Sequence, residues 1–254
     1  MMSIRSVVIC VVLLSVMLLT GCFATSKVPL DVLKYESTPQ RNKNLIVFLR
    51  GMGGTFNCIF NGHECFEKVG FVGAVRMRDL PYDMVAPDAH FGYYDDRSLN
   101  VRLKQDVILP AKAMNYEKIW LVGTSMGGLG SILYLKEYAK DIDGILLLGP
   151  FLGDRPLVDE IYSAGGIDQW KPGDFDEEKD WQRMLWSCLK ETLQDGNEYP
   201  PIYLGIGKED LYYRAQKLLA SSMSSEHVIE VSGKHRLSTF KRIWDIFLDR
   251  QILK

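Results

Sequence analysis

Short apolar runs recur along most of the chain and alternate with more polar segments. They occupy residues 45–49, 84–86, 119–122, 145–148, 202–204 and 228–231. Apart from Glu230 in the last run, the runs are apolar at consecutive positions. Both faces of the strands that they predict must therefore be covered, which is typical of a parallel sheet. The runs therefore predict the buried strands of one sheet.

Helical patterns lie between these runs. One apolar stripe after Ser125 consists of Leu129, Ile132 and Leu133. A second stripe, with the spacing i, i+3, i+4, i+7, consists of Phe240, Ile243, Trp244 and Phe247. We interpret both stripes as helix faces that contact the core and not as ligand sites. The alternation of strands and helices predicts an α/β fold, a doubly wound and mostly parallel sheet with right-handed crossovers.

Residues 151–199 interrupt this alternation, because no strand pattern occurs there. Glycine and proline break the segment at residues 165–166 and 172–173, and Trp170, Trp181 and Trp186 concentrate aromatic surface in it. We expect a small helical cap inserted over the carboxyl ends of the strands. The alternative is a set of helices packed at the edge of the sheet. A cap rich in tryptophan would favour an apolar acyl group as ligand.

The N-terminal residues have the pattern of an export signal. Arg5 precedes an apolar run at residues 7–19, which is too short for a comfortable transmembrane helix. The ending Leu19-Thr20-Gly21-Cys22 resembles the bacterial lipobox, which implies cleavage before Cys22 and lipid attachment to it. The alternative is an uncleaved anchor or a plain secretory signal. Both place the remaining chain outside the cytoplasm.

These features predict three regions. Residues 1–21 would be a lipoprotein signal peptide, residues 22–39 a tether, and residues 40–254 one globular domain held at a bacterial envelope membrane and facing the periplasm. Phe23 after the lipidated cysteine is not the aspartate associated with inner-membrane retention in enteric bacteria, so the outer membrane is favoured. The chain of 254 residues, with 47% hydrophobic residues, is consistent with one large domain.

Charge and cysteine content exclude some classes of function. The net charge of -2 provides no basic surface for nucleic acid. No spacing of cysteine and histidine is typical of zinc, so we expect no metal. Cys58 and Cys65 could form a disulfide in the periplasm if a loop at residues 61–62 brings them together. Alternatively, both remain thiols. Counting reactive thiols before and after reduction distinguishes the two states.

The sequence Gly123-Thr124-Ser125-Met126-Gly127 lies between a predicted buried strand and a helical stripe. A nucleophile elbow needs this context, because a sharp turn from strand to helix requires small residues two positions before and after the serine. The pattern alone is weak evidence, but its position between these two elements makes Ser125 a candidate nucleophile. A serine hydroxyl also needs a base, a group that orients the base, and donors for the oxyanion.

With this serine turn between a strand and a helix, the chain resembles the α/β-hydrolase superfamily, from about residue 44 to the C-terminus. Its members carry an acid and then a histidine downstream of the serine. The resemblance implies that Asp210, after the strand at 202–204, is the acid, with Glu209 as the alternative. It also implies that His235, between the last strand and the C-terminal helix, is the base.

The same resemblance implies an oxyanion hole made of two backbone N–H groups. One is that of Met126, and the other, from the glycine-rich loop after the first strand, is that of Met52. Arg50 stands where the superfamily usually has histidine, and it could pair with a carboxylate of the protein or of a substrate. His90, Tyr93 and Tyr94 could line the pocket or pack in the core.

Together these features predict a serine hydrolase that cleaves carboxylic esters or thioesters without a cofactor. A small-molecule or lipid ester would be its substrate, and the membrane its partner through Cys22. An acyltransferase or a peptidase could use the same residues. A different class of protein remains possible, namely a non-catalytic envelope lipoprotein that uses the fold as a binding scaffold.

Overall fold

The computed structural model describes residues 25–36, 42–52, 62–195 and 198–253. Its centre is a seven-stranded sheet with the order β1-β3-β2-β4-β5-β6-β7. β1 pairs antiparallel with β3, and all other neighbours are parallel. The strands are β1 (Val32–Tyr35), β2 (Asn44–Leu49), β3 (Tyr82–Pro87), β4 (Lys118–Thr124), β5 (Gly144–Leu148), β6 (Ile202–Glu209) and β7 (Val228–Lys234). All strands predicted from the apolar runs are confirmed.

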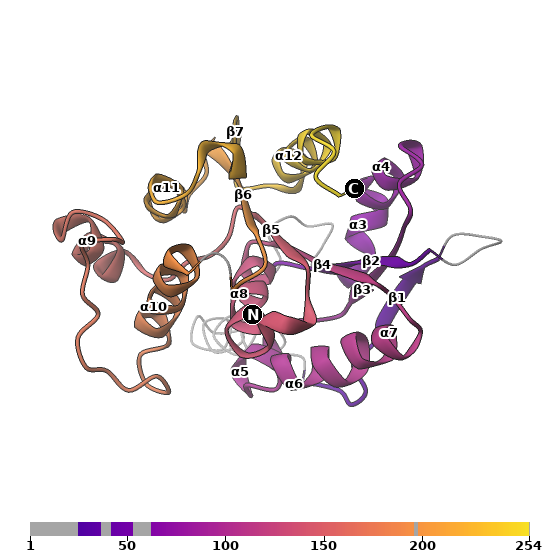
Figure 1. Cartoon of the computed structure of the whole chain (residues 1–254), viewed down its shortest axis with the longest axis horizontal. Coiled ribbons are helices and arrows are strands. Elements are labelled where there is room, and N and C mark those ends of the chain that lie inside the picture. Colours follow the sequence, from indigo (N-terminus) through magenta and orange to yellow (C-terminus); the bar gives the residue numbers. More distant parts are fainter. Residues whose placement is uncertain (1–24, 37–41, 53–61, 196–197, 254) are drawn as a thin grey trace, which may run out of the picture.

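Helices cover both faces of the sheet (Figure 1). One face carries α3 (Cys65–Lys68), α4 (Phe71–Met77) and α12 (Leu237–Asp249). The other carries α5 (Phe91–Asp95), α6 (Leu99–Leu103), α7 (Leu109–Ala113), α8 (Met126–Tyr138), α9 (Arg155–Ser163), α10 (Trp181–Gln194) and α11 (Tyr213–Ser221). A π-helical turn at Lys104–Ile108 joins α6 to α7, and short 3₁₀ turns lie at Gly62–Glu64, Ala139–Asp141 and Ser225–His227. The predicted doubly wound architecture is confirmed.

Successive residues of the central strands contribute to opposite cores. In β2, Leu45, Val47 and Leu49 pack in the core under α8, whereas Ile46 and Phe48 pack under α4 and α12. This is the period of two that a strand imposes on its side chains. Because both faces are buried, every position must be apolar, which explains the continuous hydrophobic runs in the sequence.

The segment expected to be a tether, residues 22–39, is partly a strand. Val32–Tyr35 forms β1 at the edge of the sheet, and Leu30 is buried in the core. The folded domain therefore begins before residue 40, which corrects the expected boundary. The run Val-Leu-Lys-Tyr is short and contains lysine, so its apolar pattern was too weak to predict a strand. An edge strand has only one neighbour and tolerates such polar positions.

The insertion between β5 and β6 contains two helices, which pack against other helices of the same face. α9 packs against α11, and α10 packs against α8. Arg183 of α10 pairs with Glu160 of α9, and together with Trp170 it lowers the pKa of Glu160 to about 2. The insertion is therefore both a packing layer and, through the N-terminal end of α10, a wall of the cavity described below.

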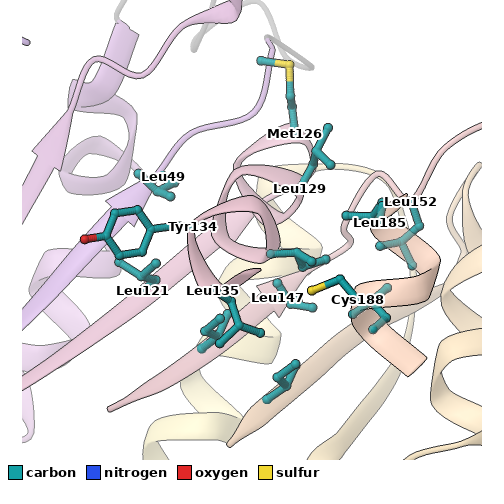
Figure 2. Close-up of a cluster of buried hydrophobic side chains, with 14 of the residues drawn as sticks. Leu49, Leu121, Met126, Leu129, Tyr134, Leu135, Leu147, Leu152, Leu185 and Cys188 are labelled. Atoms are coloured by element: carbon teal, nitrogen blue, oxygen red, sulfur yellow. The ribbon is translucent and has the colours of Figure 1, made fainter. Parts of the chain in front are cut away.

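Helix α8 is buried on nearly all sides and not only along one stripe. Leu49, Leu121 and Tyr134 lie on one flank, and Leu135, Leu147 and Cys188 of α10 lie on the other (Figure 2). The helix therefore lies between the sheet and a second layer of helices, and only its last turn carries exposed charged residues. A helix that is covered all round is expected to be apolar all round, which explains its weak amphipathic pattern.

Three sequence predictions fall on residues that the structure does not describe. These are the signal peptide at residues 1–21, the lipidation site Cys22, and Cys58 of the possible disulfide. Cys65 is buried at the start of α3. Within the described ranges, no helix combines the length and the hydropathy needed to span a membrane.

Candidate active site

The turn from β4 to α8 holds Ser125 in a strained conformation. Its φ of 52° and ψ of -114° are unusual for a residue with a side chain. Hydrogen bonds fix the turn from the end of β5, because Ser125 N donates to the Leu148 carbonyl oxygen at 2.9 Å and Phe151 N donates to the Ser125 carbonyl oxygen at 3.0 Å. The turn is therefore held in place by the neighbouring strand as well as by its own helix.

The glycines on either side of Ser125 allow the backbones to approach closely. A Cβ at Gly123 would lie 2.2 Å from the Gly127 carbonyl oxygen, and one at Gly127 would lie 2.0 Å from the Leu49 carbonyl oxygen. Real Cβ contacts are essentially never shorter than 3.0 Å. The sequence requirement for small residues at these two positions thus has a direct steric cause.

The structure brings the candidate serine, histidine and acid together from distant parts of the chain. Ser125 Oγ lies 2.9 Å from His235 Nε2, and His235 Nδ1 lies 2.7 Å from Asp210 Oδ2. The Asp210 side chain is fully buried and the His235 side chain is 10% exposed. These distances allow a proton to move from the hydroxyl to the imidazole while the carboxylate holds the ring.

Asp210 and Glu209 are separated by their environments, although they are adjacent in sequence. Asp210 follows the end of β6, and its second carboxylate oxygen accepts a hydrogen bond from Tyr212 N at 2.8 Å. Glu209 is exposed and instead accepts a hydrogen bond from Gly233 N. Of the two candidate acids, the structure brings only Asp210 into contact with His235.

Aromatic rings surround the imidazole of His235 on two sides. Tyr212 and Phe240 each meet it edge to face at 5.1 Å between ring centroids. Burial raises the pKa of the Tyr212 hydroxyl. Sequence reasoning missed these two residues as parts of the site. Phe240 belongs to the core stripe of α12, and only the proximity of Tyr212 to Asp210 could have indicated its position.

The glycine-rich loop after β2 lies beside the nucleophile turn. Gly51 N donates to Thr124 Oγ1 at 3.1 Å, so a side chain of the turn holds the loop. The next residue, Met52, lines the same cavity as Ser125 and Met126. Met126 is the first residue of α8, and the first N–H groups of a helix have no partner within it. This arrangement is compatible with the two expected oxyanion donors.

Arg50 has a carboxylate partner within the protein. Its Nε lies 2.9 Å from Asp88 Oδ1, and His63 Nδ1 lies 3.5 Å from the same oxygen. Burial acts to raise the pKa of the Asp88 carboxyl, but His63 and the charge of Arg50 outweigh it, so that the pKa lies below its ordinary value. Of the two alternatives for Arg50, the structure thus supports a partner within the protein. The pair ties the loop after β2 to the end of β3.

A cavity of about 690 Å³ opens at Ser125, which is within the range of small-molecule sites. It lies on the side of the sheet covered by α5, α6, α8 and α10, and most of its lining is apolar. Leu129 and Leu133 line it, so the interpretation of the α8 stripe as core contacts alone is wrong for these two residues. The site lies where the strand order reverses between β2 and β4, which is the usual crevice of open α/β sheets.

Of the aromatic residues considered as pocket walls, some line the cavity and others do not. Tyr93 and Tyr94 line it, and the Tyr94 hydroxyl donates to the Met126 carbonyl oxygen at 2.9 Å. Burial raises the pKa of Tyr94 well above its usual value, so the hydroxyl keeps its proton. His90 caps α5 through a hydrogen bond from Gly92 N at 3.1 Å, and burial lowers its pKa.

The tryptophans of the insertion do not form one aromatic surface. Trp181 lines the cavity. Trp170 and Trp186 are buried in the core, and their indole N–H groups donate to Glu160 and to the Leu152 carbonyl oxygen. The expectation of a cap with three tryptophans facing the ligand is wrong for these two. Trp186 belongs to α10 and Trp170 to the segment between α9 and α10, and neighbouring segments cover both, a contact that sequence spacing does not reveal.

Among the described residues, no group of three or more histidine, cysteine, aspartate or glutamate side chains is arranged to hold a metal ion. The polar groups at Ser125 are instead those of a buried hydroxyl–imidazole–carboxylate chain at a helix N-terminus. Such an arrangement can attack an electrophilic carbon and stabilise the negative charge that develops on its oxygen.

Solved structures with similar folds span nearly the whole chain. S-formylglutathione hydrolase from Staphylococcus aureus has a TM-score of 0.55 at 13% sequence identity, over 91% of this chain and 98% of that chain. Est1E from Butyrivibrio proteoclasticus, solved with ferulic acid, has a TM-score of 0.51 at 17% identity, over 89% and 96%. Monoacylglycerol lipase from Paleococcus ferrophilus has a TM-score of 0.50 at 16% identity, over 88% and 96%.

No protein-family model and no curated protein sequence matches the chain. At 13–17% identity the structural likeness shows the fold and not the activity. The chain has the α/β-hydrolase fold, with a seven-stranded, mostly parallel sheet and helices on both faces.

Proposed function

We propose that this protein is a serine hydrolase that cleaves carboxylic esters or thioesters, with Ser125 as nucleophile, His235 as base and Asp210 as the orienting acid. The observation that carries the proposal is the continuous chain of contacts from Ser125 Oγ to His235 Nε2 at 2.9 Å and from His235 Nδ1 to Asp210 Oδ2 at 2.7 Å. His235 is 25 positions from Asp210 and 110 positions from Ser125, yet the three side chains meet at the mouth of an apolar cavity.

The proposed reaction has two steps. His235 accepts the hydroxyl proton while Ser125 Oγ attacks the acyl carbon, and the backbone N–H groups of Met52 and Met126 stabilise the oxyanion. The C–O or C–S bond breaks, His235 donates the proton to the departing alcohol or thiol, and an acyl-serine remains. Water, activated by His235, then releases the acid and restores the hydroxyl. Asp210 holds the imidazole orientation and stabilises its positive charge.

Two other activities use the same residues. An acyltransferase would deliver the acyl group to an alcohol instead of water, and a peptidase would cleave an amide. The neighbours named as hydrolases and a lipase are consistent with ester cleavage, but they share only the fold at this identity. A non-catalytic scaffold is not favoured, because a binding protein has no need for a strained serine in contact with a histidine held by a buried carboxylate.

Covalent labelling with a fluorophosphonate probe tests the proposal. The probe phosphonylates a serine only when a base and an oxyanion hole activate it. We expect the folded protein to incorporate one probe per chain on the peptide that contains Ser125, and Ser125→Ala to incorporate none. Ser163→Ala, at an exposed serine of α9, is the matched control and should label like the wild type. A wild-type protein that does not react, or an equally labelled Ser125→Ala, would refute the hydrolase.

We also propose that the domain works at the bacterial envelope, anchored by lipid on Cys22, with the outer membrane favoured. Its support is the apolar run followed by Leu19-Thr20-Gly21-Cys22. In cells fed labelled palmitate, the full chain should become labelled and partition with membranes, whereas Cys22→Ser should lose both properties. Cys10→Ser, within the segment that cleavage removes, should behave like the wild type. Equal labelling of Cys22→Ser, or an unlabelled wild type, would contradict the anchor.

A further inference from the structure

The cavity at Ser125 continues as a groove along the full length of α8. Met126, Leu129, Leu133 and Glu137 of this helix all line it. Their spacing of three and four residues places them in one row on the helix surface. Because a helix rises about 1.5 Å per residue, the row extends about 16 Å from Met126 at the helix N-terminus to Glu137. Helix α8 is therefore the floor of a long groove that begins at the nucleophile.

Two sets of helices wall this floor with apolar side chains. Phe91 and Leu99, of α5 and α6, line one side. Trp181 and Met184, of the first turn of α10, line the other. Both α6 and α10 pack directly against α8, so both walls rest on the same helix. Next to Ser125 these apolar walls favour a hydrocarbon as ligand. The charged and amide residues of the lining are Asp95, Arg97, Asn100, Glu137, Glu177 and Glu178.

Polar contacts at the far end of the groove join the walls to each other and to α8. They are the hydrogen bond from Arg97 to the Glu178 carbonyl oxygen at 2.8 Å, the ion pair of Lys136 with Glu177 at 2.7 Å, and the hydrogen bond from Asn100 to Glu137 at 2.8 Å. Lys136 and Glu137 belong to the last turn of α8, and Asn100 also donates to the Leu133 carbonyl oxygen at 3.0 Å. A hydrocarbon that reached them would separate polar groups from their partners, which is unfavourable. This end therefore limits the length of chain that the groove accepts.

The groove leaves Ser125 on the side that suits the acyl part of an ester. The leaving group must lie next to His235 Nε2, because that atom returns the proton to it. His235 is not among the described residues that line the cavity, whereas Met52 and Met126, the proposed oxyanion donors, are. Ser125 Oγ, the oxyanion at these donors and the leaving group at His235 take three of the four positions on the tetrahedral carbon, and the acyl chain takes the fourth, which we assign to the groove along α8.

We propose that this groove binds the acyl chain of a straight-chain ester or thioester of about eight to twelve carbons, since each extended carbon advances roughly 1.3 Å along 16 Å. The proposal rests on the proposed function and adds its substrate class. Leu133 lies about 12 Å along the helix from Ser125 and is half-buried, so its side chain, together with the polar end, sets how far a chain can extend. It is a specificity-determining residue and takes no part in the chemistry.

Hydrolysis of p-nitrophenyl esters with acyl chains of two to sixteen carbons tests this proposal. For the wild type we expect kcat/KM to rise with chain length up to about ten or twelve carbons and then to fall. In Leu133→Trp, esters of two to six carbons should retain kcat/KM within about threefold, while those of ten to twelve carbons should lose at least about tenfold. Leu133→Ala should move the optimum to longer chains.

Two controls identify the cause of any change. Met77→Trp adds the same ring to an exposed position of α4 on the opposite face of the sheet and should leave the length profile unchanged. Acetate esters of alcohols of graded length should be insensitive to Leu133→Trp. Sensitivity to the alcohol instead of the acyl chain would overturn the assignment of the groove.

The outcomes also separate this inference from the proposed function. If short esters are hydrolysed but the wild-type profile is flat, or if Leu133→Trp changes all lengths equally, the groove proposal is wrong and the hydrolase stands. If no ester is hydrolysed and no fluorophosphonate is incorporated, the proposed function itself is wrong.

Discussion

Asp210→Asn is expected to lower kcat for ester hydrolysis by about 10⁴-fold. Asparagine has the same shape as aspartate, but it carries no charge to stabilise the imidazolium. Its amide can also donate to His235 Nδ1, which would put the proton of the neutral ring on Nε2, where Ser125 needs an acceptor. Because the Asp210 side chain is fully buried and lies 2.7 Å from the ring, water cannot replace it. Steady-state kinetics on a short p-nitrophenyl ester measure the effect.

The matched control is the adjacent Glu209→Gln. Glu209 is exposed and bonds to Gly233 N and not to His235, so its kcat should remain within about threefold of the wild type. Thermal unfolding of both variants shows whether the fold is retained. A large loss of kcat in Glu209→Gln combined with a small one in Asp210→Asn would show that the acid has been assigned to the wrong residue.

Gly127→Ala is expected to destabilise the domain by more than about 3 kcal/mol and to abolish hydrolysis. The new Cβ would lie 2.0 Å from the Leu49 carbonyl oxygen and 2.8 Å from that of Arg50. These are backbone atoms of β2 and of the loop after it, so they cannot move aside as a flexible side chain could. Either α8 separates from β2 or the turn that holds Ser125 opens. Denaturant unfolding and ester hydrolysis measure the two consequences.

Gly73→Ala provides the comparison for this substitution. Gly73 lies in α4, and nothing is found within 4 Å of the position that its Cβ would take. Alanine is favoured over glycine in a helix by up to about 1 kcal/mol, so this variant should be equally or more stable and fully active. Unchanged stability of Gly127→Ala would show that the close approach of α8 to β2 is not a requirement of the fold.

The sequence was sufficient to predict the sheet and the order of the candidate residues along it. Strands that are buried on both faces need long apolar runs, so the five inner strands have a pattern that needs no tertiary information. The strand before Ser125 and the helical stripe after it placed the elbow, and the resemblance to the α/β-hydrolase superfamily then implied Asp210 after β6 and His235 after β7. The edge strand β1 was missed, because a strand with one neighbour can carry lysine.

Only the tertiary structure showed which residues that are adjacent or similarly spaced in sequence have different contacts. Asp210 turns inward to His235 while Glu209 turns outward, a difference set by the backbone after β6. Arg50 meets Asp88 because β2 and β3 are adjacent in the sheet. Leu129 and Leu133 have a spacing that fits a core as well as a pocket, and whether such a face is covered by protein depends on how α6 and α10 pack around it. Local patterns specify which residues face inward, but the cavity beside them is formed by several helices and loops together.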